Sequence, residues 1–299
     1  MTASASDDYE LVRLANGAVS VRSRRVGETF HPVIGPVAEA EALYVRQLRL
    51  PERARREPDG LVLWDVGLGA AANALTVLRA LRDQPRPLTL LSFDHTTGPL
   101  RFALDHAPEL GYLAGYETAA RTLLAEGEVR FPNGRHMAHW RLIPGDFPRL
   151  IRAPAAAAWP APHAILFDAY SPARNPAMWT LPLFTALHAR LDPARPCALP
   201  TYSRSTLLRV TLLLAGFYVG AGHATGEKEE TTLAANTPAL IARPLDRRWL
   251  ARARRSTSAE PMREPVYRQL PLHPETRRRL ENHPQFRPSP ANRPPSSSD

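Results

Sequence analysis

The fold is decided by the stretch LVLWDVGLGAAANALTVLRALRDQPRPLTLLSFDH, which covers residues 61–95. It opens with an apolar run to Val66, continues with a helical pattern over residues 70–82, and returns to an apolar run over residues 88–93. Short apolar runs bounded by turn residues are typical of buried strands, and strands that alternate with helices form parallel sheets. The stretch therefore predicts a βαβ unit within an α/β fold.

The alternation continues on both sides of this unit. Before it, residues 9–26 alternate around Asn16-Gly17, which predicts a β-hairpin, and a helical stretch follows to about Leu48. After it, the patterns predict a helix over residues 99–106 and a hairpin over residues 128–143 around Asn133-Gly134. The strands predicted next are one that ends at Asp168, two over residues 197–202 and 217–220, and a closing antiparallel pair near 231–235 and 239–242. Helices are predicted over residues 180–191 and 203–215.

The length of 299 residues fits one large α/β domain with appendages. Residues 1–60 are predicted to form a hairpin and helix extension that packs on the core, and residues 61–247 to form the main domain. Residues 248–299 form a tail rich in Arg and Pro, and its last part, residues 282–299, is predicted to be disordered.

The formal charge of +9 comes almost wholly from arginine, because Lys228 is the only lysine. A basic surface attracts polyanions, and the planar guanidinium suits phosphate because it donates two hydrogen bonds at once. A coding bias toward Ala, Arg and Pro would produce the same composition. The charge therefore permits a nucleic-acid partner without establishing one.

Other features narrow the class of protein. Cys197 is the only cysteine and lies in an apolar run, which excludes an intrachain disulfide and indicates inert packing. The first ten residues have no basic start followed by an apolar stretch, and no segment approaches the roughly 18 apolar residues of a membrane span. We therefore expect a cytoplasmic protein without a membrane segment.

A glycine turn follows the first strand of the βαβ unit. Gly67 and Gly69 stand where glycines let a ligand approach the backbone and where the next helix offers free N–H groups. Such a turn alone is weak evidence, because it also occurs for structural reasons. NAD and S-adenosylmethionine both remain open, but the third glycine that cradles phosphates is missing, which favours an adenosyl ligand without phosphates.

Acids end three of the predicted strands. Asp94, followed by His95, stands where an acid commonly accepts hydrogen bonds from a ribose. Asp146 could receive an adenine amino group, with Phe147 available to stack. Asp168 leads into a Pro-rich polar loop, although this residue could also simply cap a turn. Because carboxyl ends of parallel strands meet at one edge, the acids predict a single crevice there.

The loop after Asp168 carries a resemblance to a known family. The stretch FDAYSPARNPAMWT, residues 167–180, resembles the methyltransferase domain of the MnmC family, which has an aspartate, an aromatic residue, A-P-A-K-N-P and M-W-T at these positions. The family methylates the aminomethyl group of a modified wobble uridine in tRNA. Supporting similarities extend over about residues 9–242, at residues 67–75, 91–94, 145–146, 201–203 and 215–217.

The resemblance implies a Rossmann-like fold with a seven-stranded, mostly parallel sheet, S-adenosylmethionine as the cofactor and tRNA as the partner. Asp168 would orient the amine and accept its proton, and Tyr170 would border the base. The remaining implied contacts are Pro172, Arg174 and Asn175 for the substrate, and Glu28, Gly67, Gly69, Asn73, Asp94, His95, Asp146 and Phe147 for the cofactor.

The chain departs from the family at two places. Where the family usually has G-x-G-T-G, Ala70 and Ala71 follow Gly69, so the cofactor loop is altered. A basic segment of the family is replaced by the more acidic residues 226–231. No flavin-binding fingerprint follows the predicted domain, which implies a stand-alone methyltransferase, and we assume a monomer.

The sequence leaves two alternative functions open. Asp168-Ala-Tyr170 also looks like the active strand of spermidine synthase, which raises an aminopropyltransferase, although Arg174 argues against a cationic substrate. The third candidate is a non-catalytic basic RNA-binding protein on a degenerate methyltransferase scaffold. The spacing of His136, His139 and His163 does not indicate a metal site.

Overall fold

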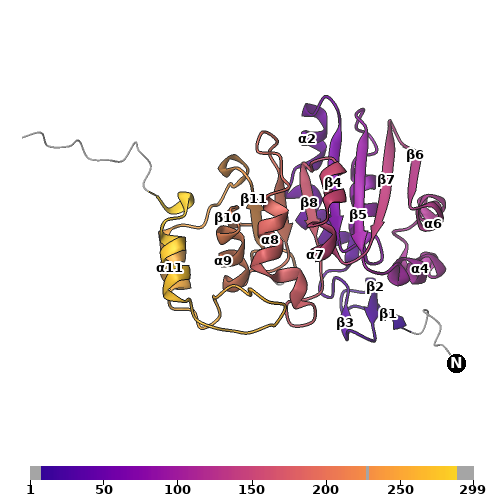
Figure 1. Cartoon of the computed structure of the whole chain (residues 1–299). Coiled ribbons are helices and arrows are strands. Elements are labelled where there is room, and N and C mark those ends of the chain that lie inside the picture. The colour runs from indigo at the N-terminus through magenta and orange to yellow at the C-terminus, as the bar shows by residue number, and fades with distance from the viewer. Residues whose placement is uncertain (1–7, 227–228, 288–299) are drawn as a thin grey trace, which may run out of the picture.

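The computed structural model describes residues 8–226 and 229–287. These residues form an eight-stranded sheet in the order β10-β11-β9-β8-β4-β5-β7-β6, shown in Figure 1. The strands are β4 (Leu61–Val66), β5 (Leu88–Asp94), β6 (Glu128–Asn133), β7 (His136–Pro144), β8 (Ala164–Phe167), β9 (Ala198–Thr201), β10 (Tyr218–Ala221) and β11 (Thr232–Ala235).

The centre of the sheet is parallel and its two edges are antiparallel. Strands β7, β5, β4, β8 and β9 pair in parallel, whereas β6 pairs antiparallel with β7, and β11 pairs antiparallel with both β9 and β10. The predicted Rossmann-like α/β class is confirmed. The sheet has eight strands rather than the predicted seven because the hairpin strand β6 extends the edge, where Pro132 needs no ladder donor.

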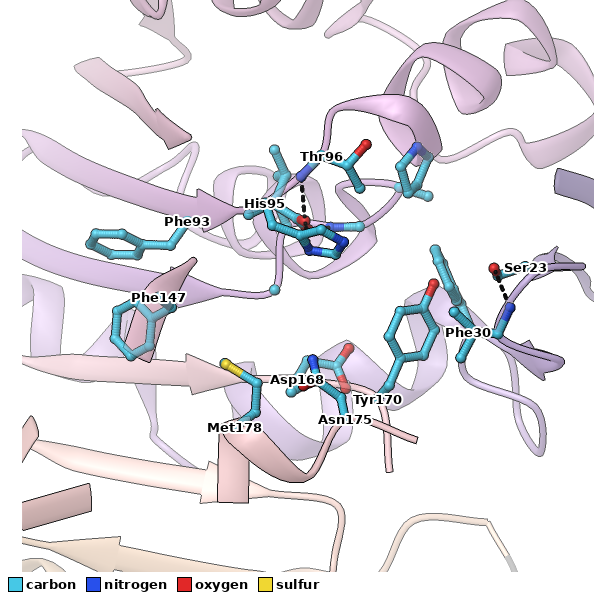
Figure 2. Close-up of a pocket in the computed structure, with 18 of the residues that line it drawn as sticks. Ser23, Phe30, Phe93, His95, Thr96, Phe147, Asp168, Tyr170, Asn175 and Met178 are labelled. Carbon is cyan, nitrogen blue, oxygen red and sulfur yellow. Dashed lines mark hydrogen bonds and ion pairs between the residues drawn. The ribbon is translucent and has the colours of Figure 1, made fainter. Parts of the chain in front are cut away.

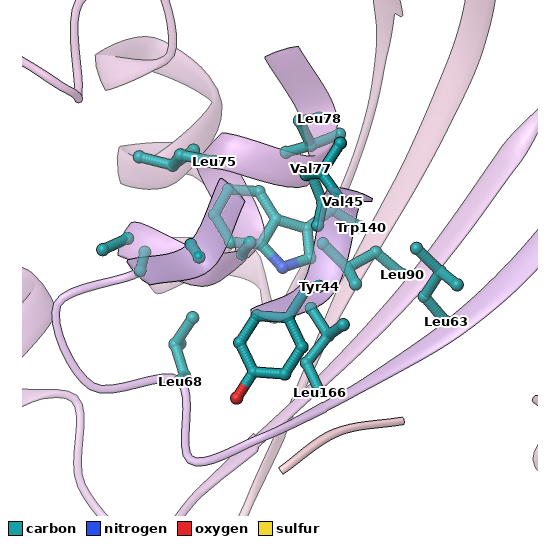
Figure 3. Close-up of a cluster of buried hydrophobic side chains, with 14 of the residues drawn as sticks. Tyr44, Val45, Leu63, Leu68, Leu75, Val77, Leu78, Leu90, Trp140 and Leu166 are labelled. Carbon is teal, nitrogen blue, oxygen red and sulfur yellow. The ribbon is translucent and has the colours of Figure 1, made fainter. Parts of the chain in front are cut away.

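Both faces of the sheet are buried under apolar side chains. Successive residues of each central strand point to opposite faces and therefore enter different cores. In β4, Leu63 points into one core and Trp64 into the other; in β8, Leu166 and Phe167 divide in the same way. Figure 3 shows the first core, in which the helical residues Tyr44 and Leu75 cover sheet residues.

Helices form the outer layers of this sandwich. The first core contains residues of α1 (Pro36–Ala40), the π-helix η2 (Glu41–Arg46), α2 (Leu50–Arg56), α3 (Ala72–Ala80), α4 (Gly98–Asp105), α5 (Ala107–Leu110) and α6 (Glu117–Glu126). The second contains residues of α7 (Phe147–Leu150), the 3₁₀ turn η4 (Pro176–Trp179), α8 (Leu181–His188), α9 (Thr206–Leu214) and α10 (Arg247–Ala253). A further 3₁₀ turn, η3 (Pro154–Ala158), precedes β8.

A separate small sheet, with the order β1-β2-β3, is built from β1 (Tyr9–Arg13), β2 (Val19–Ser23) and β3 (Glu28–Thr29). The predicted hairpin is its first part. Figure 1 shows this sheet beyond the carboxyl ends of the central strands. The N-terminal extension therefore lies where α/β folds bind their ligands.

Two predictions for the C-terminal part are wrong. Residues 239–242 do not form a strand; Pro238 cannot donate to a ladder and instead begins the 3₁₀ turn η5 (Pro238–Leu240). Residues 282–287 are ordered rather than disordered, because η6 (Pro284–Phe286) buries Phe286 after α11 (Pro274–Glu281). Residues 288–299 of the predicted disordered tail lie outside the described residues. The division of the chain at residues 60 and 247 stays a prediction.

Cys197 is buried, as predicted, and burial raises the pKa of its thiol to about 12. Among the described residues, we find no helix with the length and apolar content needed to cross a membrane.

We predict that α11 is part of the main core. Leu280 is fully buried against the second core. Leu280→Ala should therefore lower the free energy of unfolding by about 2–5 kcal/mol, measured by urea denaturation. The matched control is Leu270→Ala, because Leu270 is 41% exposed and should change this free energy by less than about 0.5 kcal/mol. Equal effects of the two substitutions would contradict the packing of α11.

Candidate functional site

A cavity of about 450 Å³ opens at the carboxyl edge of the sheet. Figure 2 shows Phe93 and Phe147 at one end and Ser23 and Phe30 at the other. All but two of the predicted site residues line it, namely Gly67, Gly69, Asn73, Asp94, His95, Asp146, Phe147, Asp168, Tyr170, Arg174 and Asn175. Glu28 and Pro172 do not. The predicted strand ends therefore meet in one crevice.

The turn after β4 comes unusually close to the end of β8. Gly67 has a φ of +95°, and a Cβ atom there would lie 2.4 Å from the carbonyl oxygen of Asp168. The N–H groups of Gly67 and Leu68 both donate to the carbonyl oxygen of Phe93, at 2.9 and 3.2 Å. Only glycine fits this position, because both its conformation and its contacts exclude a side chain.

Asp94 is bound to the same turn. Its Oδ2 accepts a hydrogen bond of 2.9 Å from the N–H of Gly69, and its Oδ1 accepts one of 3.1 Å from the N–H of Thr96. His95 Nδ1 lies 3.2 Å from Oδ1, and this hydrogen bond raises the pKa of His95. The carboxylate is thus oriented at the cavity wall, with lone pairs left for a further donor.

The ends of β5 and β7 supply an aromatic wall. The rings of Phe93 and Phe147 meet edge to face, with centroids 5.1 Å apart. Asp146 lines the cavity with its side chain half exposed, 3.6 Å from the exposed Arg149. This end of the cavity can take a flat apolar ring whose edge carries a donor.

Contacts from neighbouring side chains restrain one oxygen of the Asp168 carboxylate. Its Oδ2 accepts a hydrogen bond of 2.7 Å from Asn73 Nδ2, and His31 Nε2 lies 3.5 Å from the same oxygen. In residues 8–226 and 229–287, no hydrogen bond reaches Oδ1 of Asp168. The side chain is 19% exposed and lines the cavity, so this carboxylate keeps capacity for a ligand donor.

Hydrogen bonds to the backbone fix the loop after Asp168. Tyr202 donates to the carbonyl oxygen of Ala169 at 3.0 Å, and Trp179 Nε1 donates to that of Tyr170 at 2.7 Å. Glu28 accepts from the N–H of Ser171 at 3.1 Å and from its hydroxyl. Glu28 therefore clamps the loop to β3 rather than lining the cavity.

The Tyr170 side chain packs against the N-terminal segment, near the small sheet. Its ring packs at a tilt on Phe30, with centroids 5.6 Å apart. Burial raises the pKa of Tyr170. Its predicted role beside a base stays a prediction, as do the roles of the other predicted site residues.

Sequence reasoning missed most of the wall that the N-terminal segment supplies. Tyr9, Ser23, Arg25, Phe30 and His31 all line the cavity. His31 also has a φ of +48°, a left-handed conformation that is uncommon outside glycine and that often marks a functional position. The only signal was the stretch GETFHP, residues 27–32, in which Glu28 alone was singled out.

Ala71 occupies the last glycine position of the family's G-x-G-T-G turn and keeps a glycine-like backbone. Its φ and ψ are 63° and 14°, and it is fully buried at the start of α3. Alanine adopts this left-handed conformation only at a conformational cost that glycine does not incur.

The three histidines considered for a metal site do not converge. His136 Nδ1 contacts the carbonyl oxygen of Gln84, His139 contacts Glu128, and His163 accepts from the N–H of Val62. In the described part of the chain, no group of three or more potential metal-ligating side chains comes together.

Comparisons with known proteins identify relatives of this chain. Residues 121–237 match a family model described as S-adenosyl-L-methionine-dependent methyltransferase. The tRNA 5-methylaminomethyl-2-thiouridine biosynthesis bifunctional protein MnmC is 30% identical over 229 residues in Aeromonas hydrophila and 29% identical over 245 residues in Cupriavidus necator. The alignments cover 72% and 77% of this chain but 34% and 36% of the relatives, so the chain spans about a third of their length.

Residues 121–237 belong to an S-adenosyl-L-methionine-dependent methyltransferase family, and the chain is similar to MnmC over about three quarters of its length. The predictions of enzyme class, family and cofactor are thereby confirmed.

Solved structures share the fold of this methyltransferase. MNMC2 from Aquifex aeolicus superposes with a TM-score of 0.66 at 22% identity, over 91% of this chain and 84% of that one. A spermidine synthase in complex with the transition-state analogue AdoDATO gives 0.50 at 11% identity, also over 91% and 84%. At these identities the likeness supports the fold alone.

Atoms that line the cavity match the chemical groups of S-adenosylmethionine. Asn73 is 3% exposed, and its Oδ1 is buried without a hydrogen-bond partner among the described residues, so an acceptor is available for an ammonium group. Asp94 can accept from ribose hydroxyls, and the wall at Phe93 and Phe147 suits a purine. Gly67 also lines the cavity.

We predict that Ala71 carries backbone strain. Ala71→Gly loses a buried methyl group but relieves a left-handed conformation that costs about 1 kcal/mol. The matched control, Ala74→Gly in the same helix, loses an equally buried methyl group and adds about 1 kcal/mol of helix cost. In thermal or urea denaturation, Ala71→Gly should be milder by about 2 kcal/mol. A difference of about 1 kcal/mol or less, which the helix cost at Ala74 alone would produce, would show that Ala71 is unstrained.

Proposed function

We propose that this methyltransferase methylates the amine of an aminomethyl group on a modified wobble uridine of tRNA, with Asp168 binding that amine. The observation that carries the proposal is the Asp168 carboxylate, which faces the cavity with Oδ1 free of protein hydrogen bonds among the described residues. The names of the MnmC relatives, which refer to tRNA 5-methylaminomethyl-2-thiouridine, support the choice of substrate.

The cofactor would lie between the glycine turn and the aromatic wall. Gly67, Gly69 and the Oδ1 atom of Asn73 would hold its methionine part, Asp94 its ribose, and Asp146 with Phe147 its adenine. When bound, S-adenosylmethionine supplies a methyl group on a positively charged sulfur, which is already a good leaving group. The protein's contribution is therefore to position the acceptor and control its proton.

The acceptor must reach the methyl group as a neutral amine. An alkylamine is mostly protonated near neutral pH, so Asp168 would first pair with the ammonium and then accept its proton, directly or through water. The nitrogen lone pair then forms the new N–C bond, and the electron pair of the broken S–C bond stays on sulfur. The proton leaves Asp168 for solvent, which restores the carboxylate.

Asn73 and His31 would keep Asp168 in the orientation this requires. Both contact Oδ2, at 2.7 and 3.5 Å, and therefore turn Oδ1 toward the cavity. Because Asn73 also lies beside the proposed methionine position, one side chain links the cofactor to the acceptor site. His31 acts from the N-terminal segment and is a positioning residue on this account.

The aminopropyl-transfer alternative fits less well. A polyamine site needs several acids around a cationic chain, whereas Arg25 and Arg174 line the cavity on the acceptor side. These arginines suit a polyanion such as RNA. We further propose that the protein acts in the cytoplasm, where tRNA is modified; the assumed monomer stays a prediction.

We predict that the charge of Asp168 is needed for methyl transfer. Asp168→Asn keeps the size of the side chain but cannot accept the proton, and Asp168→Ala removes it altogether. Both should lower kcat/KM for tRNA containing aminomethyluridine by about a hundredfold or more, while the affinity for S-adenosylmethionine stays within about tenfold. Transfer of a labelled methyl group and calorimetry measure the two quantities.

The matched control is Asp105→Asn, because Asp105 is exposed in α4 and does not line the cavity. This variant should keep wild-type kcat/KM. Wild-type activity in Asp168→Asn would remove Asp168 from the mechanism, and wild-type enzyme that methylates no aminomethyluridine in tRNA would refute the substrate.

We predict that His31 affects the rate rather than cofactor binding. His31→Asn tolerates the left-handed backbone but is too short to reach Asp168, so kcat should fall by about tenfold because the carboxylate loses a contact that orients it. His95→Asn, at another cavity histidine, should instead weaken S-adenosylmethionine binding. A kcat within about twofold of wild type for His31→Asn would show that this contact does not orient Asp168.

A further inference from the structure

Two arginines at the edge of the cavity have no partner to neutralise them. Arg25 lies in the turn between β2 and β3, and Arg174 lies in the loop after β8. Both are exposed and line the cavity, and within the described part of the chain neither guanidinium forms an ion pair or hydrogen bond. By contrast, the neighbouring Arg22 and Arg24 both pair with Glu10, at 3.6 and 3.1 Å.

The two guanidinium groups belong to one surface, although 149 positions separate them in the sequence. A Cβ atom on Gly27 would lie 3.9 Å from Nη2 of Arg174, so this side chain reaches the turn that carries Arg25. Glu28 fixes the two segments relative to each other through its hydrogen bonds to Ser171. The pair is therefore held by the same contact that anchors the Asp168 loop.

The position of the two arginines favours an anionic group that belongs to the acceptor substrate. The guanidinium fork matches the oxygens of a phosphate, and unpaired arginines facing a cavity raise the local concentration of anions. The cofactor carries no phosphate. A nucleotide can bring its base to Asp168 only if it is splayed out of its strand, and its own backbone phosphates then remain at the cavity mouth.

We propose that Arg25 and Arg174 bind the backbone phosphates that flank the nucleotide inserted into the cavity. The ligand class is single-stranded RNA, such as the loop of a stem-loop. The proposal rests on the proposed function for the identity of the base, but the phosphate contacts themselves do not depend on catalysis. The two arginines would set which nucleotide of the loop reaches Asp168.

The test uses Arg25→Gln, Arg174→Gln and the double variant of the full chain, with Arg24→Gln as the matched control. Arg24 lies next to Arg25 and loses the same charge, but its guanidinium is already paired with Glu10. The probe is a fluorescently labelled RNA stem-loop with the sequence of a tRNA anticodon arm. Its affinity is measured by anisotropy over a series of KCl concentrations, and the affinity for S-adenosylmethionine by calorimetry.

Each Gln substitution should weaken RNA binding by about five- to tenfold at low salt and reduce the slope of log K against log[KCl] by about 0.7. Arg24→Gln should stay within about twofold, and cofactor affinity should be unchanged in all variants. The proposal is overturned if the double variant binds RNA as Arg24→Gln does. It is also overturned if the loss falls on S-adenosylmethionine with an unchanged salt slope, since the arginines would then hold the cofactor carboxylate.

Failure of the proposed function gives a different result. An enzyme that binds the stem-loop through this pair but transfers no methyl group to it would refute the tRNA substrate and leave the phosphate contacts standing. If the enzyme methylates the stem-loop but the double variant binds RNA with unchanged affinity, the phosphate contacts are refuted and the tRNA substrate stands.

Discussion

The site depends on the close approach of two backbones at the carboxyl ends of β4 and β8. These strands pair in parallel, the N–H of Asp168 donates to the carbonyl oxygen of Val66 at 3.0 Å, and Gly67 then passes so near that no side chain fits. This contact places the Gly67 turn directly beside the Asp168 carboxylate. In the proposed function, a methyl group bound at one backbone is therefore within reach of an amine bound at the other.

Side chains from outside the sheet make this arrangement rigid. Trp179 and Tyr202 hold the backbone of the Asp168 loop from the second core, while Glu28 holds it from the small sheet. Asn73 and His31 add contacts to the carboxylate itself. Because the loop is fixed on opposite sides, Asp168 keeps its direction before any substrate arrives, which lowers the entropy cost of binding the acceptor.

The central sheet and the acids at its edge could be predicted from the sequence because both follow from short local patterns. Apolar runs such as Leu61–Val66 show the strands, and parallel pairing then brings Asp94, Asp146 and Asp168 to one edge. The helix α11 escaped prediction because its sequence, PETRRRLE, has a single apolar residue, Leu280, whose burial depends on distant packing. Likewise, the bond between Glu28 and Ser171 joins residues 143 positions apart and leaves no local signal.

The two sides of the cavity are built from different parts of the fold, which explains why the cavity residues of the N-terminal segment are harder to predict from the sequence. The proposed cofactor side is built from strand ends, whose geometry the sheet dictates, so its residues appear at regular places in the sequence. The proposed acceptor side is built where a turn of the small sheet meets the Asp168 loop, and only side-chain contacts such as that of Glu28 define it. Substitutions in residues 23–31 can therefore change which acceptor enters while the cofactor turn at Gly67 stays intact.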